Sequence, residues 1–296
     1  MDPFVVLITV LVLLALLLGI GVWVGLSLFA VAVISLALFR SMPVEKLLAQ
    51  LTYNTVTTPE MVALPMFILM AEILFHTRLS ASLFKGLSPW TNKLPGRMVH
   101  VNVLGCTLFA AISGSSAATA TTVGRITLSE LFRRGYDKDL VIGSLAGAGT
   151  LGFLIPPSII LIIYGVLSET SILKLFIAGI VPGLILALGF MGYLAIRATL
   201  KPSLIPSEDS DPTWRDRLNG LYDLGPVVFL ILLVLGSMYA GFASPSEAAA
   251  VGVLGAVLVS AAQKTLSWNT IRKACLGAVR TTSMIAMIVA GAVFLS

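Results

Sequence analysis

Charged residues are scarce in this chain, since Asp, Glu, Lys and Arg make up 11% of its 296 residues, against about 25% in soluble domains. Hydrophobic residues reach 57%, and the mean hydropathy is +1.01. Several uninterrupted apolar runs have the roughly 18 residues that cross the hydrocarbon core of a bilayer. This excludes a soluble globular enzyme and a protein with a single membrane anchor. The sequence predicts an all-α polytopic membrane protein.

Cysteine is also rare. The two cysteines, Cys106 and Cys275, are far apart and form no metal-binding or redox motif, which predicts reduced packing residues. The net charge of +5 comes without a basic stripe interleaved with aromatic residues, so no nucleic-acid partner is indicated. The opening residues, MDPFVVLITV, include no basic region and no cleavage site of small residues. We therefore expect a first membrane span there and no signal peptide.

The apolar runs divide into spans and surface segments. Residues 4–39 are too long for one crossing and hold three glycines near their middle, which predicts spans at about 4–23 and 25–39. Amphipathic surface helices are expected at 41–57, 78–93 and 263–278. Further spans are expected at about 60–76, 172–197, 224–241, 246–262 and 279–296, with a soluble linker at 199–217.

Two segments do not have the pattern of ordinary spans. Small and hydroxylated residues, SGSSAATATT, interrupt 98–132, and the sequence GAGTLGFLIPPS interrupts 139–168. Glycines and a double proline deny a helix its internal hydrogen bonds, so such backbone persists at membrane depth only where protein or a polar cavity surrounds it. The first segment predicts a re-entrant helical hairpin, and the second predicts a helix broken in mid-span.

The order of elements predicts an inverted repeat. A pattern of span, turn, span, amphipathic helix and span recurs after roughly 220 residues, as in secondary transporters. The first copy makes five crossings, so the second begins on the opposite face. Fifteen Lys and Arg residues then lie in cytoplasmic segments and three outside, which favours an N-terminus on the periplasmic side. The second copy stops at Ser296, before a hairpin of its own, and we expect a truncated second half.

The interruptions contain the residue types of an ion site. Ser113 and Ser115 supply hydroxyls at the hairpin tip, and the unwound backbone around Gly152 and Ile155 supplies carbonyl oxygens. Broken helices in inverted repeats hold substrate and coupling ions near the midplane, and these neutral oxygens suit Na⁺. The alternative is that the small residues only allow helices to pack closely.

The motifs FAAISGSSAATATTVGRI, AGAGTLGFLIPPSIILIIYG and FASPSEAAAVGVLGA resemble those of the large membrane subunit (DctM family) of tripartite ATP-independent periplasmic (TRAP) transporters. The resemblance covers the whole chain. It implies import of a small organic anion, such as a dicarboxylate or a sugar acid, by an elevator mechanism driven by a Na⁺ gradient. It also implies a bacterial inner-membrane location, a small four-helix membrane subunit and a periplasmic protein that delivers the substrate.

The resemblance assigns roles to particular positions. The residues implied for Na⁺ are Ser113, Ser115, Gly152, Ile155 and Pro157. Those implied for the substrate are Ser116, Thr119, Thr122, Arg125 and Ser158. Arg125 departs from the family pattern, because many relatives have a small residue after that glycine. It pairs with a substrate carboxylate or extends to the cytoplasmic interface.

Other functions are also compatible with parts of the pattern. A stand-alone dicarboxylate/sodium symporter and a scaffold subunit without transport are the alternatives, whereas no HExxH or GxSxG motif indicates an intramembrane enzyme. Glu72 is expected to form an interfacial pair with a partner subunit. The predicted division is 1–97 scaffold spans and interfacial arm helices, 98–168 transport hairpin and broken helix, 169–198 closing span, 199–217 cytoplasmic linker, and 218–296 start of the second inverted repeat.

Overall fold

The computed structural model describes residues 3–39, 44–77, 79–206 and 212–295, and within these ranges the chain forms helices joined by turns, with no strand. The helices before the hairpin tip are α1 (Pro3–Gly19), α2 (Val24–Phe39), α3 (Val44–Val56), α4 (Pro59–Phe75), α5 (Leu79–Thr91) and α6 (His100–Ser113). Those after it are α7 (Ser116–Arg133), α8 (Lys138–Gly149), α9 (Ile159–Leu167), α10 (Ile172–Leu200), α11 (Trp214–Ile231), α12 (Ser237–Tyr239), α13 (Pro245–Ala262) and α14 (Trp268–Leu295).

Four helical segments of the described chain are long and apolar enough to cross a membrane. They are α10, α11 with its continuation to Tyr239, α13 and α14. The bent pair α3 and α4 meets the same test when it is counted as one span, whereas α1 and α2 are apolar but only 17 and 16 residues long. The fold is therefore that of an all-α polytopic membrane protein, as the composition predicts.

The linker is shorter than its predicted bounds of 199–217. Helix α10 continues to Leu200, and α11 already begins at Trp214. Thr213 explains the early start, because its hydroxyl accepts the N–H of Asp216 while the Asp216 carboxylate accepts the N–H of Thr213. This reciprocal capping box satisfies two amides of the first turn. The predicted span at 224–241 is thus the later part of one longer helix.

The predicted boundary near residue 278 does not exist. From Trp268 to Leu295, most of the predicted surface segment at 263–278 and the predicted span at 279–296 form one continuous helix, α14. In the first half, α3 and α4 instead bend by 58°, just before Pro59, which stands at the start of α4. Proline donates no backbone hydrogen bond and disfavours a helical residue before it. No proline occurs in α14, so its hydrogen-bond ladder continues without a break.

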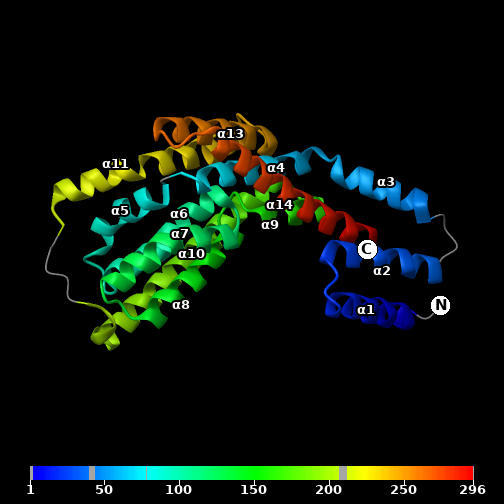
Figure 1. Cartoon of the computed structure of the whole chain (residues 1–296), viewed down its shortest axis with the longest axis horizontal. Helices are drawn as coiled ribbons and strands as arrows, with labels where there is room; N and C mark the ends of the chain where they lie inside the picture. Colours follow the sequence, from blue (N-terminus) through cyan, green and yellow to red (C-terminus); the bar gives the residue numbers. More distant parts are fainter. Residues whose placement is uncertain (1–2, 40–43, 78, 207–211, 296) are drawn as a thin grey trace.

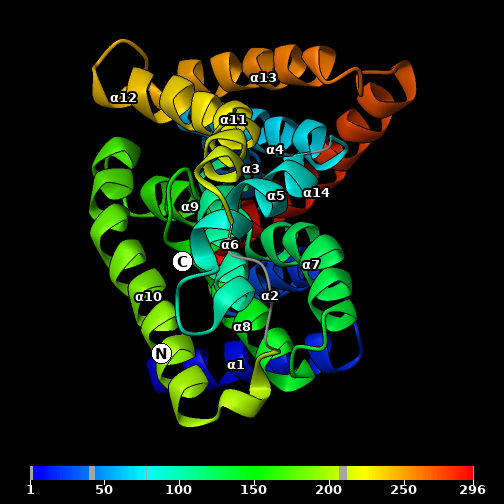
Figure 2. The same ribbon diagram turned by 90° about the vertical axis from the view of Figure 1, so that its left-hand side faces the viewer.

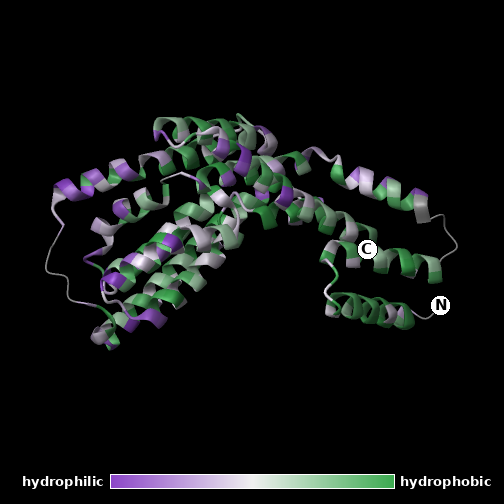
Figure 3. Ribbon diagram, in the orientation of Figure 1, coloured by the Kyte–Doolittle hydropathy of each residue, from purple (hydrophilic) through white to green (hydrophobic). Residues whose placement is uncertain are grey.

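Helices from the first part of the chain pack against helices from its last part. Helix α2 lies along α14, and α4 lies along α13, while α11 lies along α5. The α5–α11 contact is close, since a Cβ atom on Gly220 would lie 2.7 Å from the carbonyl oxygen of Gly86. Small residues permit such approach between membrane helices. Figure 3 shows an apolar α1 and more hydrophilic residues on α3 and at the start of α11.

A candidate ion and substrate site

The hairpin turns over two residues. Helix α6 ends at Ser113, Gly114 has a φ of 60°, and Ser115 caps α7 by accepting the N–H of Ala118 at 3.4 Å. A side chain at Gly114 would be strained by this φ and would also meet the carbonyl oxygen of Pro157 at 2.5 Å. The predicted hairpin in 98–132 is therefore present, and its tip lies against residues more than forty positions later.

The second interruption separates α8 from α9. Residues Thr150–Phe153 form one 3₁₀ turn, and the chain returns to helix only at Ile159. Ser158 caps α9, since its hydroxyl donates to the carbonyl oxygen of Phe153 at 2.8 Å and accepts the N–H of Leu161 at 3.5 Å. Pro156 and Pro157 have no N–H to continue a helix. The broken helix predicted for 139–168 is confirmed.

The hairpin tip and the helix break contact each other through backbone. The Ile159 N–H donates to the carbonyl oxygen of Gly114 at 3.1 Å. A Cβ atom on Gly152 would lie 2.8 Å from the backbone of Ser115 and Ser116. The five residues implied for Na⁺ thus lie in two touching segments, although the Ile155 side chain packs toward Gly183 of α10.

The hydroxyl groups at the tip are already partly engaged. The Oγ atom of Ser113 lies 2.8 Å from Oγ1 of Thr119, and both residues are buried. Thr122 is buried too, and its hydroxyl has no partner among the described residues. Within those residues no group of three His, Cys, Asp or Glu side chains gathers at a possible metal site. A cation at the junction would therefore be bound by hydroxyl and carbonyl oxygens.

A cavity of about 410 Å³ opens beside the tip, between α4, α6, α7, α9 and α14. Ser113, Ser115 and Thr121 line it from the hairpin, while Glu72 and Thr281 line it from α4 and α14. None of the predicted substrate residues, Ser116, Thr119, Thr122, Arg125 and Ser158, is part of this lining. The guanidinium of Arg125 lies 4.8 Å from the centroid of the Phe75 ring, and Phe75 lines the cavity.

Comparison with known proteins places this architecture in a family. The family model described as the DctM component of tripartite ATP-independent periplasmic transporters matches residues 11–296. The chain belongs to the DctM family.

Three relatives illustrate the membership. The chain is 37% identical to the C4-dicarboxylate TRAP transporter large permease protein DctM of Pseudomonas aeruginosa, over 68% of this chain and 46% of that protein. It is 33% identical to the ectoine/5-hydroxyectoine TRAP transporter large permease protein UehC of Ruegeria pomeroyi, over 76% and 52%. It is 30% identical to the sialic acid TRAP transporter permease protein SiaT of Haemophilus influenzae, over 88% and 42%. The chain spans about half the length of these curated relatives.

Membership in the DctM family makes the chain a multi-pass protein of the bacterial inner membrane. The relatives are named as permeases and not as enzymes, in agreement with the absence of hydrolase motifs. The sequence resemblance to this family is thereby confirmed.

Sequence reasoning missed three cavity residues of this DctM-family chain. Thr121 follows Ala117 by one helical turn and precedes Arg125 by another, a spacing of four that indicates one face of α7. Glu72 is a carboxylate in the later, apolar part of α4, three turns after Glu60 at its start, which is itself a signal of function. Its carboxylate lies against α14, because a Cβ atom on Gly277 would meet it within 2.9 Å, and its pairing with a partner subunit stays a prediction. Thr281, one turn after Gly277, had no local signal.

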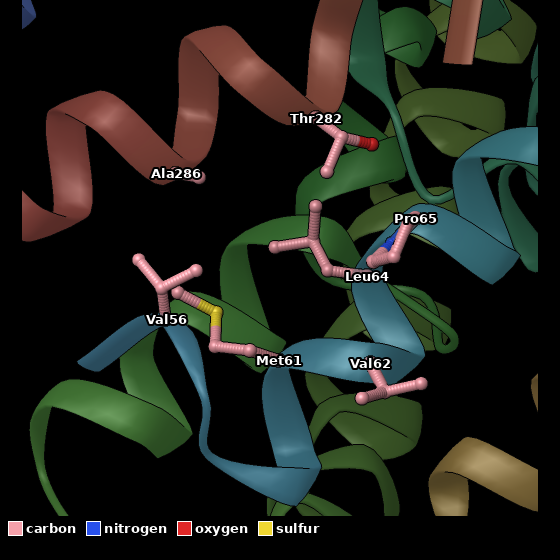
Figure 4. Close-up of a pocket in the computed structure, with 7 residues that line it drawn as sticks. All are labelled: Val56, Met61, Val62, Leu64, Pro65, Thr282 and Ala286. Carbon is pink, nitrogen blue, oxygen red and sulfur yellow. The ribbon is translucent and has the colours of Figure 1, made fainter. Parts of the chain in front are cut away.

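A second pocket has a different chemical character. It measures about 210 Å³ and lies where the α3–α4 bend faces α14. Figure 4 shows Met61, Leu64 and Val56 together with Ala286, and Thr282 is its one polar side chain. Without a charged residue or several hydroxyls, this pocket does not suit an organic anion.

The base of the hairpin carries charge outside the candidate spans. Glu130 forms ion pairs with Arg133 at 2.6 Å and with Arg134 at 2.8 Å. Hydrogen bonding from Arg133, followed by that from Arg134, holds the pKa of Glu130 below its usual value. Arg133 is exposed while Glu130 and Arg134 are half-buried, so the charged residues lie at the opposite end of α7 from the small, hydroxylated tip.

Proposed function

We propose that this chain belongs to the membrane subunit of a Na⁺-coupled secondary transporter that imports a small organic anion by an elevator mechanism. The observation that supports this most strongly is the backbone contact between the hairpin tip and the helix break, in which Ile159 donates to Gly114 at 3.1 Å. Two discontinuous helical segments that meet in this way form the type of site at which transporters bind ions and substrates.

The chemistry of the junction favours Na⁺ over a proton. Hydroxyls of Ser113 and Ser115 and the carbonyls of residues 152–157 are neutral oxygens, and none of them titrates near neutral pH. Gly114 and Gly152 leave no space for a side chain at the contact. The backbone is therefore held close enough for carbonyls of one segment and hydroxyls of the other to surround a single cation.

An anionic substrate is supported by the helix ends. The N-termini of α7 and α9, at Ser115 and Ile159, both reach the 410 Å³ cavity. Helix N-termini carry partial positive charge and free N–H groups, which attract carboxylates. The relatives are named for C4-dicarboxylates, ectoines, isethionate and sialic acid. All of these bear a carboxylate except isethionate, which bears a sulfonate, and we propose a small solute with a carboxylate for this chain.

The mechanism and partners follow from the same proposal. The hairpin and the broken helix move as one body against α4, α13 and α14, and a small four-helix membrane subunit supports the static part. A periplasmic binding protein delivers the substrate. The bias of Lys and Arg puts the N-terminus on the periplasmic side and the linker after α10 in the cytoplasm.

The test is uptake by the complete large subunit, reconstituted with its small subunit and binding protein in proteoliposomes. A Na⁺ gradient should drive uptake, and a proton gradient alone should not. Gly152→Ala should reduce Na⁺-driven uptake by about tenfold or more, because its Cβ would lie 2.8 Å from the Ser115 backbone. Gly143→Ala is the matched control in α8, since a Cβ there meets nothing within 4 Å.

Each alternative has its own outcome in this assay. Na⁺-driven uptake without the binding protein would favour a stand-alone symporter. Variants at the tip that change assembly but not flux would favour a non-transporting scaffold. Equal uptake by Gly152→Ala and Gly143→Ala would refute the placement of the ion site at the junction of the hairpin tip and the helix break.

A further inference from the structure

One carboxylate lines the cavity beside the hairpin tip. Glu72 comes from α4, opposite Ser113, Ser115 and Thr121 of the hairpin. The cavity volume of about 410 Å³ lies within the range of small-molecule sites. A carboxylate is costly in such a place and marks a functional residue by default. Its role is not explained by a neutral oxygen site for Na⁺ or by recognition of an anion.

No ion pair to this carboxylate is formed among the described residues, and His76 acts on it electrostatically without a direct contact. The ion pairs found there join Glu130 to Arg133 and Arg134, and none involves Glu72. His76 lies one helical turn after Glu72. Its Nδ1 atom is 2.9 Å from the backbone oxygen of Glu72 and makes no hydrogen bond to the Glu72 carboxylate. Since Gly277 lies directly against the carboxylate, the side chain has little freedom to turn away from the cavity.

The cavity therefore combines charge of both signs. Glu72 supplies negative charge from α4, whereas Arg125 is exposed, stacks on Phe75 at 4.8 Å and does not line the cavity. Ser115 and Ile159 bring the positive N-termini of α7 and α9 to the same space. A dianion fits such a cavity poorly, because like charges about 5 Å apart at an effective dielectric of about 20 disfavour binding by about a hundredfold.

We infer that Glu72 is a specificity-determining residue that selects substrates with a cationic nitrogen as well as a carboxylate, that is, small zwitterions. The nitrogen pairs with Glu72, and the carboxylate faces the hairpin tip, where the N-termini of α7 and α9 reach the cavity. This inference rests on the proposed function, keeps the substrate carboxylate and adds a cationic nitrogen, so that the substrate has no net charge. It assigns to α4 a direct part in recognition, separate from the ion site.

The test is direct binding to the purified complete large subunit, so that the binding protein's own selectivity does not enter. The probes are three zwitterions (ectoine, proline and glycine betaine) and two anions (succinate and lactate), each titrated while thermal stabilisation is followed. In the wild type, at least one zwitterion should bind about tenfold or more tightly than succinate. Glu72→Gln should abolish that preference, and Glu72→Asp should retain part of it.

The matched control is Glu60→Gln, the same chemical change in the first turn of α4, at a position that does not line the cavity. It should keep the wild-type preference. Unliganded melting temperatures show whether Glu72→Gln remains folded. Equal weakening of zwitterions and anions, an unchanged preference, or a weaker response to Na⁺ alone would each overturn the inference. Loss of Na⁺-driven uptake with the charge preference intact would instead refute the proposed function and leave this inference standing.

Discussion

The contact between α10 and the helix break leads to a quantitative prediction. Gly179 packs so closely on the break that an added Cβ would lie 2.5 Å from the carbonyl oxygen of Leu154, whereas ordinary contact begins at 3.4 Å. That carbonyl belongs to backbone and has no flexible side chain to yield. Overpacking of this kind costs about 1–3 kcal/mol. Gly179→Ala should therefore destabilise the protein, even though alanine favours helix over glycine by about 1 kcal/mol.

The same helix provides two reference positions. A Cβ on Gly189 would meet nothing within 4 Å, and one on Gly183 would meet the Ile155 side chain at 2.9 Å. The three variants share the gain in helix propensity, so differences among them isolate the clash. We expect Gly189→Ala to be the most stable, Gly183→Ala to be intermediate because a side chain can shift, and Gly179→Ala to be the least stable by about 1–3 kcal/mol relative to Gly189→Ala.

The measurement is the fraction of the purified complete subunit that stays monodisperse by size-exclusion chromatography after heating. Apparent melting temperatures should follow the order Gly189→Ala, Gly183→Ala, Gly179→Ala from highest to lowest. Equal melting temperatures for Gly179→Ala and Gly189→Ala would refute the packing of α10 on the break. A higher melting temperature for Gly179→Ala would show that propensity outweighs contact at this position.

Three further predictions concern other parts of the chain. Cys275→Ser first removes the exposed cysteine. In this background a membrane-impermeant thiol reagent should label Ser171→Cys in intact cells but not Ser203→Cys, which lies in the linker after α10. The reverse pattern would contradict the proposed orientation. Ser113→Ala should lower the free energy of unfolding by about 1–3 kcal/mol, because it leaves the buried Thr119 hydroxyl without its partner at 2.8 Å. Adding Thr119→Val should recover part of this loss in a double-mutant cycle. Additive losses would argue against the hydrogen bond. Thr282→Val should leave the melting temperature unchanged or raise it, because the Thr282 hydroxyl is buried without a partner in the described chain, and a clear drop would show that this hydroxyl is bonded in the protein.

The sequence predicts local interruptions well because they depend on local chemistry. Gly114 with a positive φ and the consecutive prolines at 156 and 157 interrupt helices here, although single prolines lie inside α4, α5, α10 and α11. The hairpin and the broken helix were therefore predictable from residue order alone. The α3–α4 bend before Pro59 has the same origin, and the continuity of α14 follows from the absence of such a residue.

The lining of the cavity was less predictable, because it depends on which face of each helix meets a neighbour. Thr119 and Thr121 are both hydroxylated and only two residues apart, but Thr119 is buried beside Ser113 while Thr121 lines the cavity. Residues two apart on a helix point in very different directions. The inward position of Glu72 depends on α14, which approaches from about 200 residues later in the chain. No pattern within one segment encodes that contact.

The lengths of the helices around the tip have a consequence for dehydration. Helices α6, α8 and α9 have 14, 12 and 9 residues, or about 21, 18 and 14 Å at 1.5 Å per residue, against a hydrocarbon core about 30 Å thick. Each of them is too short to cross that core, so their polar ends meet at depth. In the ion site that we propose there, an ion would exchange its hydration water for fixed protein oxygens. Discrimination by ionic size would then depend on a backbone contact, Ile159 to Gly114, and not on a side chain.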